Sequence, residues 1–87
     1  MSEQPVGVVI HYFPKIGVAG VSVVSGHLEI GDLVFFGGHT TGFRQTVESM
    51  EIEHEPVERA EAGEQVGIRV IDRVRVGDKV FRDPPPE

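Results

Sequence analysis

Leu28-Glu29-Ile30-Gly31-Asp32-Leu33-Val34-Phe35 carries the most informative pattern in this chain, because the pattern returns at residues 74–81 as Val-Arg-Val-Gly-Asp-Lys-Val-Phe. Glycine tolerates a positive φ and aspartate accepts backbone N–H bonds, so the Gly-Asp pair predicts a turn. The Val and Phe that follow favour a buried strand. We therefore expect two equivalent turns that lead into strands. The alternative is a coincidence of turn chemistry.

The rest of the chain is rich in valine and glycine, which favours short strands separated by turns. Strands are predicted at residues 6–13, 17–25, 33–36, 44–56, 66–70 and 79–82. A period of two places Val6, Val8, Ile10 and Tyr12 on one face of the first strand.

Three local features modify this pattern. Gly20 indicates a bend or bulge inside the second predicted strand. The change of face between Val47 and Met50 predicts a bulge in the long strand. Residues 57–62 fit one turn of helix and a loop equally well.

Short strands spaced by turn signals predict an all-β sandwich or barrel. At 87 residues, a small closed antiparallel β-barrel is favoured, because closure removes exposed strand edges. We expect a single barrel domain at residues 6–82, a disordered N-terminus at residues 1–5 and a solvated Pro-rich tail at residues 83–87.

The net charge of −6 comes from one segment of the chain. Seven glutamates and one arginine lie between residues 48 and 64, and the remainder carries seven acids and seven bases. General nucleic-acid or anionic-membrane binding needs a basic footprint, so both are disfavoured. Residues 69–82 nevertheless carry five bases and two acids.

Composition and spacing argue against several kinds of site. The absence of cysteine excludes disulfides and thiolate chemistry. The four histidines lack the spacing of a chelating motif, so we expect no metal and no cofactor. The carboxylates cluster on one solvated face, so we expect no catalysis. The chain shows no secretory signal and no apolar run of roughly 20 residues, which predicts a soluble cytoplasmic protein without a membrane partner.

Residues 37–44, Gly-Gly-His-Thr-Thr-Gly-Phe-Arg, are the best candidate for a ligand contact. This loop offers backbone N–H groups, two hydroxyls, an imidazole, an aromatic ring and a guanidinium. Such groups suit the end of a single-stranded RNA or a peptide, by stacking and hydrogen bonding. The alternative is that the threonines only stabilise the turn.

Several ordered motifs resemble known families. Ile30-Gly31-Asp32, Val47-Glu48-Ser49-Met50 and the Ala-Gly-X-X-Val-Gly at residues 62–67 resemble the second domain of translational GTPases such as elongation factor Tu. The His-Tyr-Phe at residues 11–13, the Gly-His-Thr-Thr-X-Phe at residues 38–43 and the strand at residues 47–54 resemble the C-terminal barrel of the collagenase-like peptidase family thirty-two. The resemblance implies a six- to seven-stranded barrel of the translation elongation factor domain 2 type.

The resemblance also implies a function. In the GTPases this domain contacts tRNA and ribosomal RNA, and several members of the peptidase-like family are associated with RNA modification. We therefore expect a non-catalytic binding module that contacts tRNA, rRNA or a translation or RNA-modification protein. This chain matches neither a GTPase nor a catalytic domain, so nucleotide hydrolysis and proteolysis are not carried over.

Two sets of residues express these expectations. The predicted RNA contact consists of His39, Thr40, Thr41, Phe43, Arg44 and Gln45. Lys15 and the late arginines, which are the arginines within residues 69–82, are expected to give electrostatic support. The alternative function is protein interaction or self-association, in which an acidic strand docks a basic partner through Glu51, Glu53 and Glu55. The oligomeric state is left open.

Overall fold

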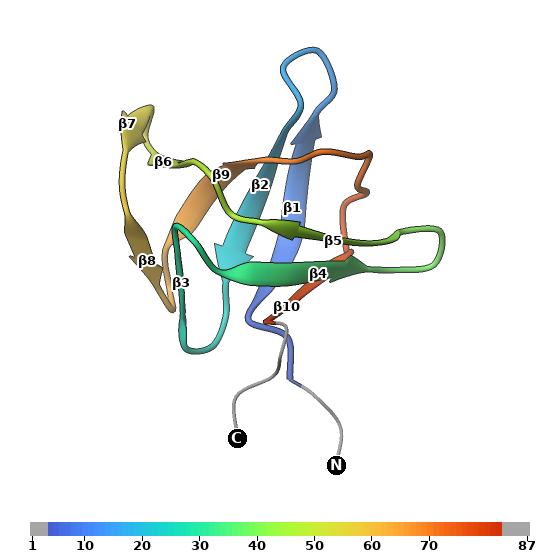
Figure 1. Cartoon of the computed structure of the whole chain (residues 1–87), viewed down its shortest axis with the longest axis horizontal. Coiled ribbons are helices and arrows are strands. Elements are labelled where there is room, and N and C mark those ends of the chain that lie inside the picture. The colour runs from blue at the N-terminus through green and yellow to red at the C-terminus, as the bar shows by residue number, and fades with distance from the viewer. Residues whose placement is uncertain (1–3, 83–87) are drawn as a thin grey trace.

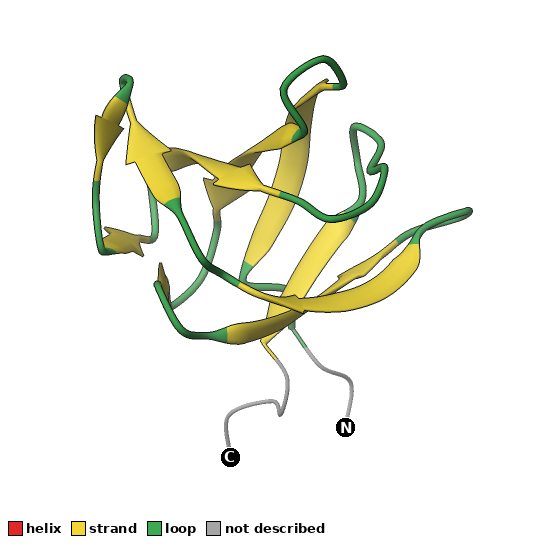
Figure 2. Ribbon diagram, turned by 45° about the horizontal axis from the view of Figure 1, so that its top comes forward, coloured by secondary structure: helices red, strands yellow, loops and turns green. Residues whose placement is uncertain are grey.

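A computed structural model describes residues 4–82 of the chain, and these form ten strands and no helix (Figures 1 and 2). The strands are β1 (Gly7–Phe13), β2 (Val18–Val23), β3 (His27–Glu29), β4 (Leu33–Gly37), β5 (Gly42–Thr46), β6 (Met50–Ile52), β7 (Glu55–Pro56), β8 (Arg59–Glu61), β9 (Gln65–Arg69) and β10 (Lys79–Arg82). The all-β, antiparallel prediction is confirmed. Within this part of the chain no helix is long and apolar enough to cross a membrane.

Eight of the strands form one sheet in the order β5-β4-β10-β1-β2-β9-β6-β7, and β3 pairs with β8 in a second sheet. Figure 1 shows β4 and β5 running across β1 and β2. The expected closed barrel of six to seven strands is wrong in closure and strand number, because the end strands β5 and β7 do not pair with each other. The predicted strand at residues 44–56 is divided into β5, β6 and β7, and Glu53 and His54 turn the chain with φ of 52° and 67°.

The repeated Gly-Asp turn is confirmed, and the structure adds a third copy. The turns span residues 29–32, 61–64 and 75–78, and the third residue of each is a glycine with φ of 97–98°. In chain order, the side chain of the fourth residue accepts the N–H of the first at 3.0, 2.7 and 2.8 Å. A positive φ at the third position is the requirement of a type II turn.

Each of these turns is joined to a buried valine by two backbone hydrogen bonds. The turn glycine donates to the valine carbonyl, and the valine N–H donates to the carbonyl of the last turn residue, all at 2.8–2.9 Å. The valines are Val47, Val23 and Val9 for the three turns in chain order, and each is at most 1% exposed. Each turn therefore holds the backbone of one buried core valine in place.

The buried face of β1 differs from the prediction. The register between β1 and β2 shifts between Val9 and His11, so Val9 is buried and Ile10 is 40% exposed. The extra residue lies beside Gly20, where a bend or bulge was expected, but it lies in β1. Gly7 and Val9 are buried before the bulge and Tyr12 packs against the core after it, so no single period of two describes this strand.

Two other local predictions need correction. Val47 and Met50 are both buried, but the chain leaves β5 and enters β6 between them, so no bulge within one strand is involved. Residues 57–62 form neither a helical turn nor a plain loop, since β8 pairs with β3 there. Ala60 of β8 is fully buried opposite Leu28, and this packing selects a strand.

The two predicted terminal segments fall wholly or partly outside the described residues. The Pro-rich tail at residues 83–87 and residues 1–3 of the predicted disordered N-terminus are not described. Gln4 and Pro5 precede β1, and the Pro5 carbonyl accepts a hydrogen bond from Ser25 Oγ at 2.8 Å. The domain limits stay predictions.

Candidate nucleic-acid interface

The loop between β4 and β5 is a tight turn that projects from one side of the molecule (Figure 1). Gly38 N donates to the Thr41 carbonyl at 2.9 Å, which closes the turn. His39 and Thr40 lie at its tip, and both are exposed. The loop therefore presents an imidazole and a hydroxyl to solvent on a fixed backbone.

Asp78 anchors this loop from beneath. The carboxylate is 5% exposed, accepts the Thr41 hydroxyl, and accepts Arg75 N at 2.8 Å. A Cβ placed on Gly38 would lie 2.0 Å from Asp78 Oδ1, so the loop passes directly over the carboxylate. One buried side chain thus joins the β4–β5 loop to the turn before β10.

An open depression of about 310 Å³ lies between these two segments. One wall comes from residues 40–43, and the other comes from Asp72, Arg73 and Arg75. Both arginines are exposed, and Asp72 Oδ1 accepts the N–H of Arg73 at 2.7 Å. The depression therefore combines two cations, one carboxylate, hydroxyls and an aromatic ring.

Phe43 and Arg44 lie on opposite faces of β5. The Phe43 ring stacks on the buried Phe36 ring, with centroids 5.1 Å apart and an interplanar angle of 12°. The Arg44 guanidinium lies 5.3 Å from the centroid of Phe35. Of this pair, only Phe43 lines the depression.

Gln45 and Lys15 lie apart from the depression. Gln45 is 7% exposed, its Nε2 donates to the Arg69 carbonyl at 2.8 Å, and its Oε1 accepts Ile71 N at 2.8 Å. Lys15 is exposed in the turn between β1 and β2, which Figure 1 shows away from the β4–β5 loop. The structure thus brings Thr40, Thr41 and Phe43 together with Arg73 and Arg75.

Sequence reasoning missed the anchoring role of Asp78 and the place of Asp72 in the depression. The signal for Asp78 was present, because the Gly-Asp pair already marked it as a turn acceptor. Another late arginine, Arg82, does not line the depression. Its Nη2 donates to the His27 carbonyl at 2.6 Å and to Asp32 Oδ2 at 3.0 Å.

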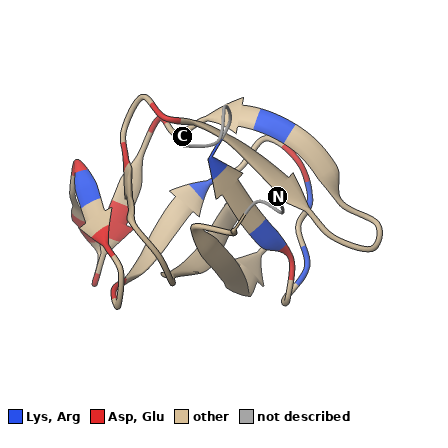
Figure 3. Ribbon diagram, turned by 90° about the horizontal axis from the view of Figure 1, so that it is seen from below, with Lys and Arg blue, Asp and Glu red and all other residues tan. Residues whose placement is uncertain are grey.

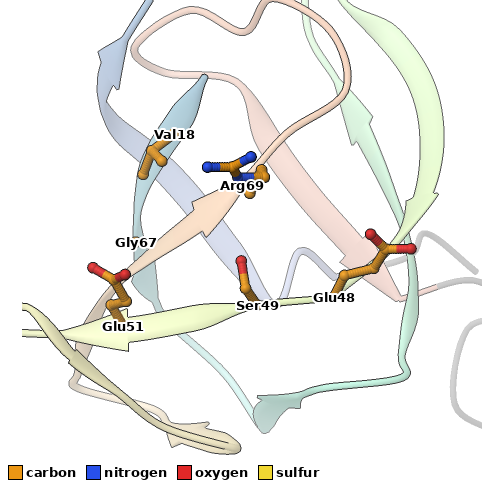
Figure 4. Close-up of a pocket in the computed structure, with 6 residues that line it drawn as sticks. All are labelled: Val18, Glu48, Ser49, Glu51, Gly67 and Arg69. Carbon is orange, nitrogen blue, oxygen red and sulfur yellow. The ribbon is translucent and has the colours of Figure 1, made fainter. Parts of the chain in front are cut away.

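A second open groove, of about 460 Å³, lies on the outer face of β2, β6 and β9 (Figure 4). Val18 and Gly67 form part of its lining, together with charged and hydroxyl side chains. Figure 4 shows Arg69 and Glu51 projecting from neighbouring strands. The remaining lining residues are Glu48 and Ser49.

The predicted acidic surface lies on β6, β7 and the turn between them. Glu51, Glu53 and Glu55 are exposed, and within residues 4–82 their carboxylates form no hydrogen bond or ion pair. Figure 3 shows most of the acidic segments on one side of the molecule and most of the basic segments on the other.

The histidines are placed singly in the described part of the chain. His27 Nε2 lies 3.2 Å from Glu29 Oε1, and His11 lies 4.3 Å from Phe13 between ring centroids. Residues 4–82 contain no group of three or more His, Asp or Glu side chains arranged to hold a metal ion.

Comparison with known proteins gives three further findings. The family model of elongation factor Tu domain 2 matches residues 17–80. A collagenase of Porphyromonas gingivalis is 42% identical over 78 residues, which cover 88% of this chain and 22% of that protein. An uncharacterized protease of Methanocaldococcus jannaschii is 39% identical over 77 residues, which cover 87% of this chain and 19% of that protein. This chain therefore spans about a fifth of the length of the curated relatives it matches.

Among solved structures, the C-terminal domain of a protein of Geobacillus thermoleovorans described as a U32 peptidase has the same fold. Its TM-score is 0.83 at 25% identity, and the match covers 92% of this chain and 91% of that chain.

Proposed function

Because this chain belongs to the elongation factor Tu domain 2 family, we propose that it is a non-catalytic binding module that contacts single-stranded RNA, such as an exposed end or loop of tRNA or rRNA. The observation that carries the proposal is the depression between the β4–β5 loop and residues 72–75. The peptidase activity named for the relatives is not part of the proposal, because the chain spans only about a fifth of their length.

The lining of the depression supports this ligand. Arg73 and Arg75 supply cations for phosphates, and phosphate contacts dominate nucleic-acid affinity. Phe43 supplies an aromatic edge for a base, while Thr40 and Thr41 supply hydroxyls. Most of the acidic residues lie on the other side of the molecule, and Asp72 is the one carboxylate among the lining residues, against two arginines (Figure 3).

Charge reversal at Arg73 tests the proposal against a matched control. Arg73→Glu changes the net charge by the same amount as Arg59→Glu, but Arg59 lies in β8, paired with Glu61 on the acidic side. In an NMR titration with a short single-stranded RNA at low salt, we expect shifts at residues 39–43 and 72–75. Arg73→Glu should weaken this binding by about tenfold, and Arg59→Glu should change it little. An absence of shifts in the parent chain would overturn the proposal.

A second candidate function is protein interaction through Glu51, Glu53 and Glu55. The observation that favours it is that these exposed carboxylates have no partner within residues 4–82. Complementary charge steers the encounter of protein partners. The partner would be a basic surface on an RNA-associated protein or on a second copy of the chain.

A capture experiment separates this candidate from RNA binding. Reversal of Glu51, Glu53 and Glu55 to lysine should abolish recovery of a protein partner while the far-ultraviolet circular dichroism stays unchanged. RNA binding at the depression should persist in this variant. Unchanged recovery of the partner would count against the acidic surface.

A further inference from the structure

The hydroxyl of Thr41 has a fixed role in the depression. It donates its hydrogen to the Asp78 carboxylate, which is buried and also holds Arg75 N. A threonine hydroxyl has one hydrogen and two lone pairs. A ligand in the depression therefore meets Thr41 as an acceptor.

The negative charge of Asp78 reinforces this role. A hydrogen bond donated to a carboxylate is charge-assisted, and donation polarises the hydroxyl so that its oxygen becomes a better acceptor. Asp72 lines the same depression and is also an acceptor. The depression thus presents cations for phosphate together with acceptors that require a donor on the ligand.

We propose that Thr41, oriented by Asp78, accepts a hydrogen bond from a ribose 2′-hydroxyl, so that the site prefers RNA to DNA. This inference rests on the proposed function. Phosphate contacts from Arg73 and Arg75 serve RNA and DNA equally, whereas the 2′-hydroxyl is the group that distinguishes the two. Deoxyribose lacks the donor, and a 2′-O-methyl ribose keeps the oxygen but has no hydrogen to donate.

Fluorescence anisotropy with three labelled strands tests this proposal. The strands share one uracil-containing sequence of about ten nucleotides, within the usual site size, and carry ribose, deoxyribose or 2′-O-methyl ribose. We expect the ribose strand to bind about threefold to tenfold more tightly than either of the others, the size of one net hydrogen bond.

Two substitutions at one position assign the preference to Thr41. Thr41→Val removes the hydroxyl and should bring the affinity for the ribose strand down to that for the deoxyribose strand. Thr41→Ser keeps the hydroxyl and should keep the preference. The control Thr46→Val makes the same chemical change at an exposed residue of β5 outside the depression, and it should leave the preference intact. Urea unfolding of each variant verifies the fold.

The outcomes separate this inference from the proposed function. Equal affinity for the ribose and deoxyribose strands would overturn the inference and leave the nucleic-acid contact standing. A preference that survives Thr41→Val would overturn the assignment to Thr41. Binding of none of the three strands would overturn the proposed function, and the inference with it.

Discussion

The side chain of Gln45 connects two distant segments of the chain. Its amide bridges β5 to the end of β9, two strands that are not neighbours in the sheet order. Its Nε2 donates to the Arg69 carbonyl, and its Oε1 accepts the Ile71 N–H. The inward position of Gln45 could have been predicted from the sequence, because a period of two places Phe43, Gln45 and Val47 on the same face of the strand.

Removal of this amide should be costly. Gln45→Ala removes two part-buried hydrogen bonds that hold β5 to residues 69–71, so we expect a loss of about 2 kcal/mol in the free energy of unfolding. Gln65→Ala, at an exposed position of β9, should stay within about 0.5 kcal/mol of the parent chain. Urea unfolding measures both, and equal losses would contradict the bridging role.

Gly38 is required by its distance to Asp78. In Gly38→Ala the new Cβ would lie 2.0 Å from Asp78 Oδ1 and 2.7 Å from its Cγ, so the carboxylate must move away from Thr41 and Arg75. Loss of these bonds to a charged group should cost about 2 kcal/mol. Gly42→Ala is the control, because its Cβ meets only Phe35 Cζ at 3.9 Å. Thermal unfolding tests the pair, and a stable Gly38→Ala would refute the contact.

At the level of elements, the three Gly-containing turns organise the fold. Two of them follow from the repeated octapeptide. The third does not match the Gly-Asp pattern, because a glutamate replaces the aspartate and its longer side chain accepts the equivalent N–H. Turn chemistry is local, so the sequence could predict it. The break between β6 and β7 was not predictable, because Glu53 and His54 have positive φ without glycine.

Alanine at the turn glycines gives an element-scale prediction. Gly31→Ala, Gly63→Ala and Gly77→Ala each force a side chain into a φ of 97–98°, and each should lose about 1–2 kcal/mol of stability. The three losses should be similar, because the three turns share one geometry. Guanidinium unfolding measures them, and a near-neutral variant would show that its turn can rearrange.

At the scale of the whole molecule, charge is separated in space as well as along the chain (Figure 3). Opposite the acidic side, Arg73 and Arg75 face one depression. A basic contact of this size suits a short segment of RNA and not a continuous nucleic-acid coat. The net charge of −6 therefore reflects the acidic segment at residues 48–64, while the rest of the chain is neutral overall.

Salt dependence tests the size of this contact. If Arg73 and Arg75 each neutralise one phosphate, the logarithm of the RNA binding constant should fall with the logarithm of salt with a slope of about −1.4. Arg73→Ala should reduce the slope to about −0.7. Anisotropy titrations across several salt concentrations measure both, and a slope near zero would show that the arginines do not contact phosphate.

The sequence by itself determined the all-β class, the Gly-Asp turns and the segregation of charge along the chain, because period, turn chemistry and composition are local properties. It did not determine which loop meets which turn. That follows from the pairing of β10 with β4, in which Lys79 lies opposite Gly37, so the turn before β10 comes to lie beside the loop after β4. Only this long-range pairing places Asp78 under Thr41 and brings Arg73 and Arg75 to the depression that Phe43 lines, since a strand selects its partner by packing across the whole core.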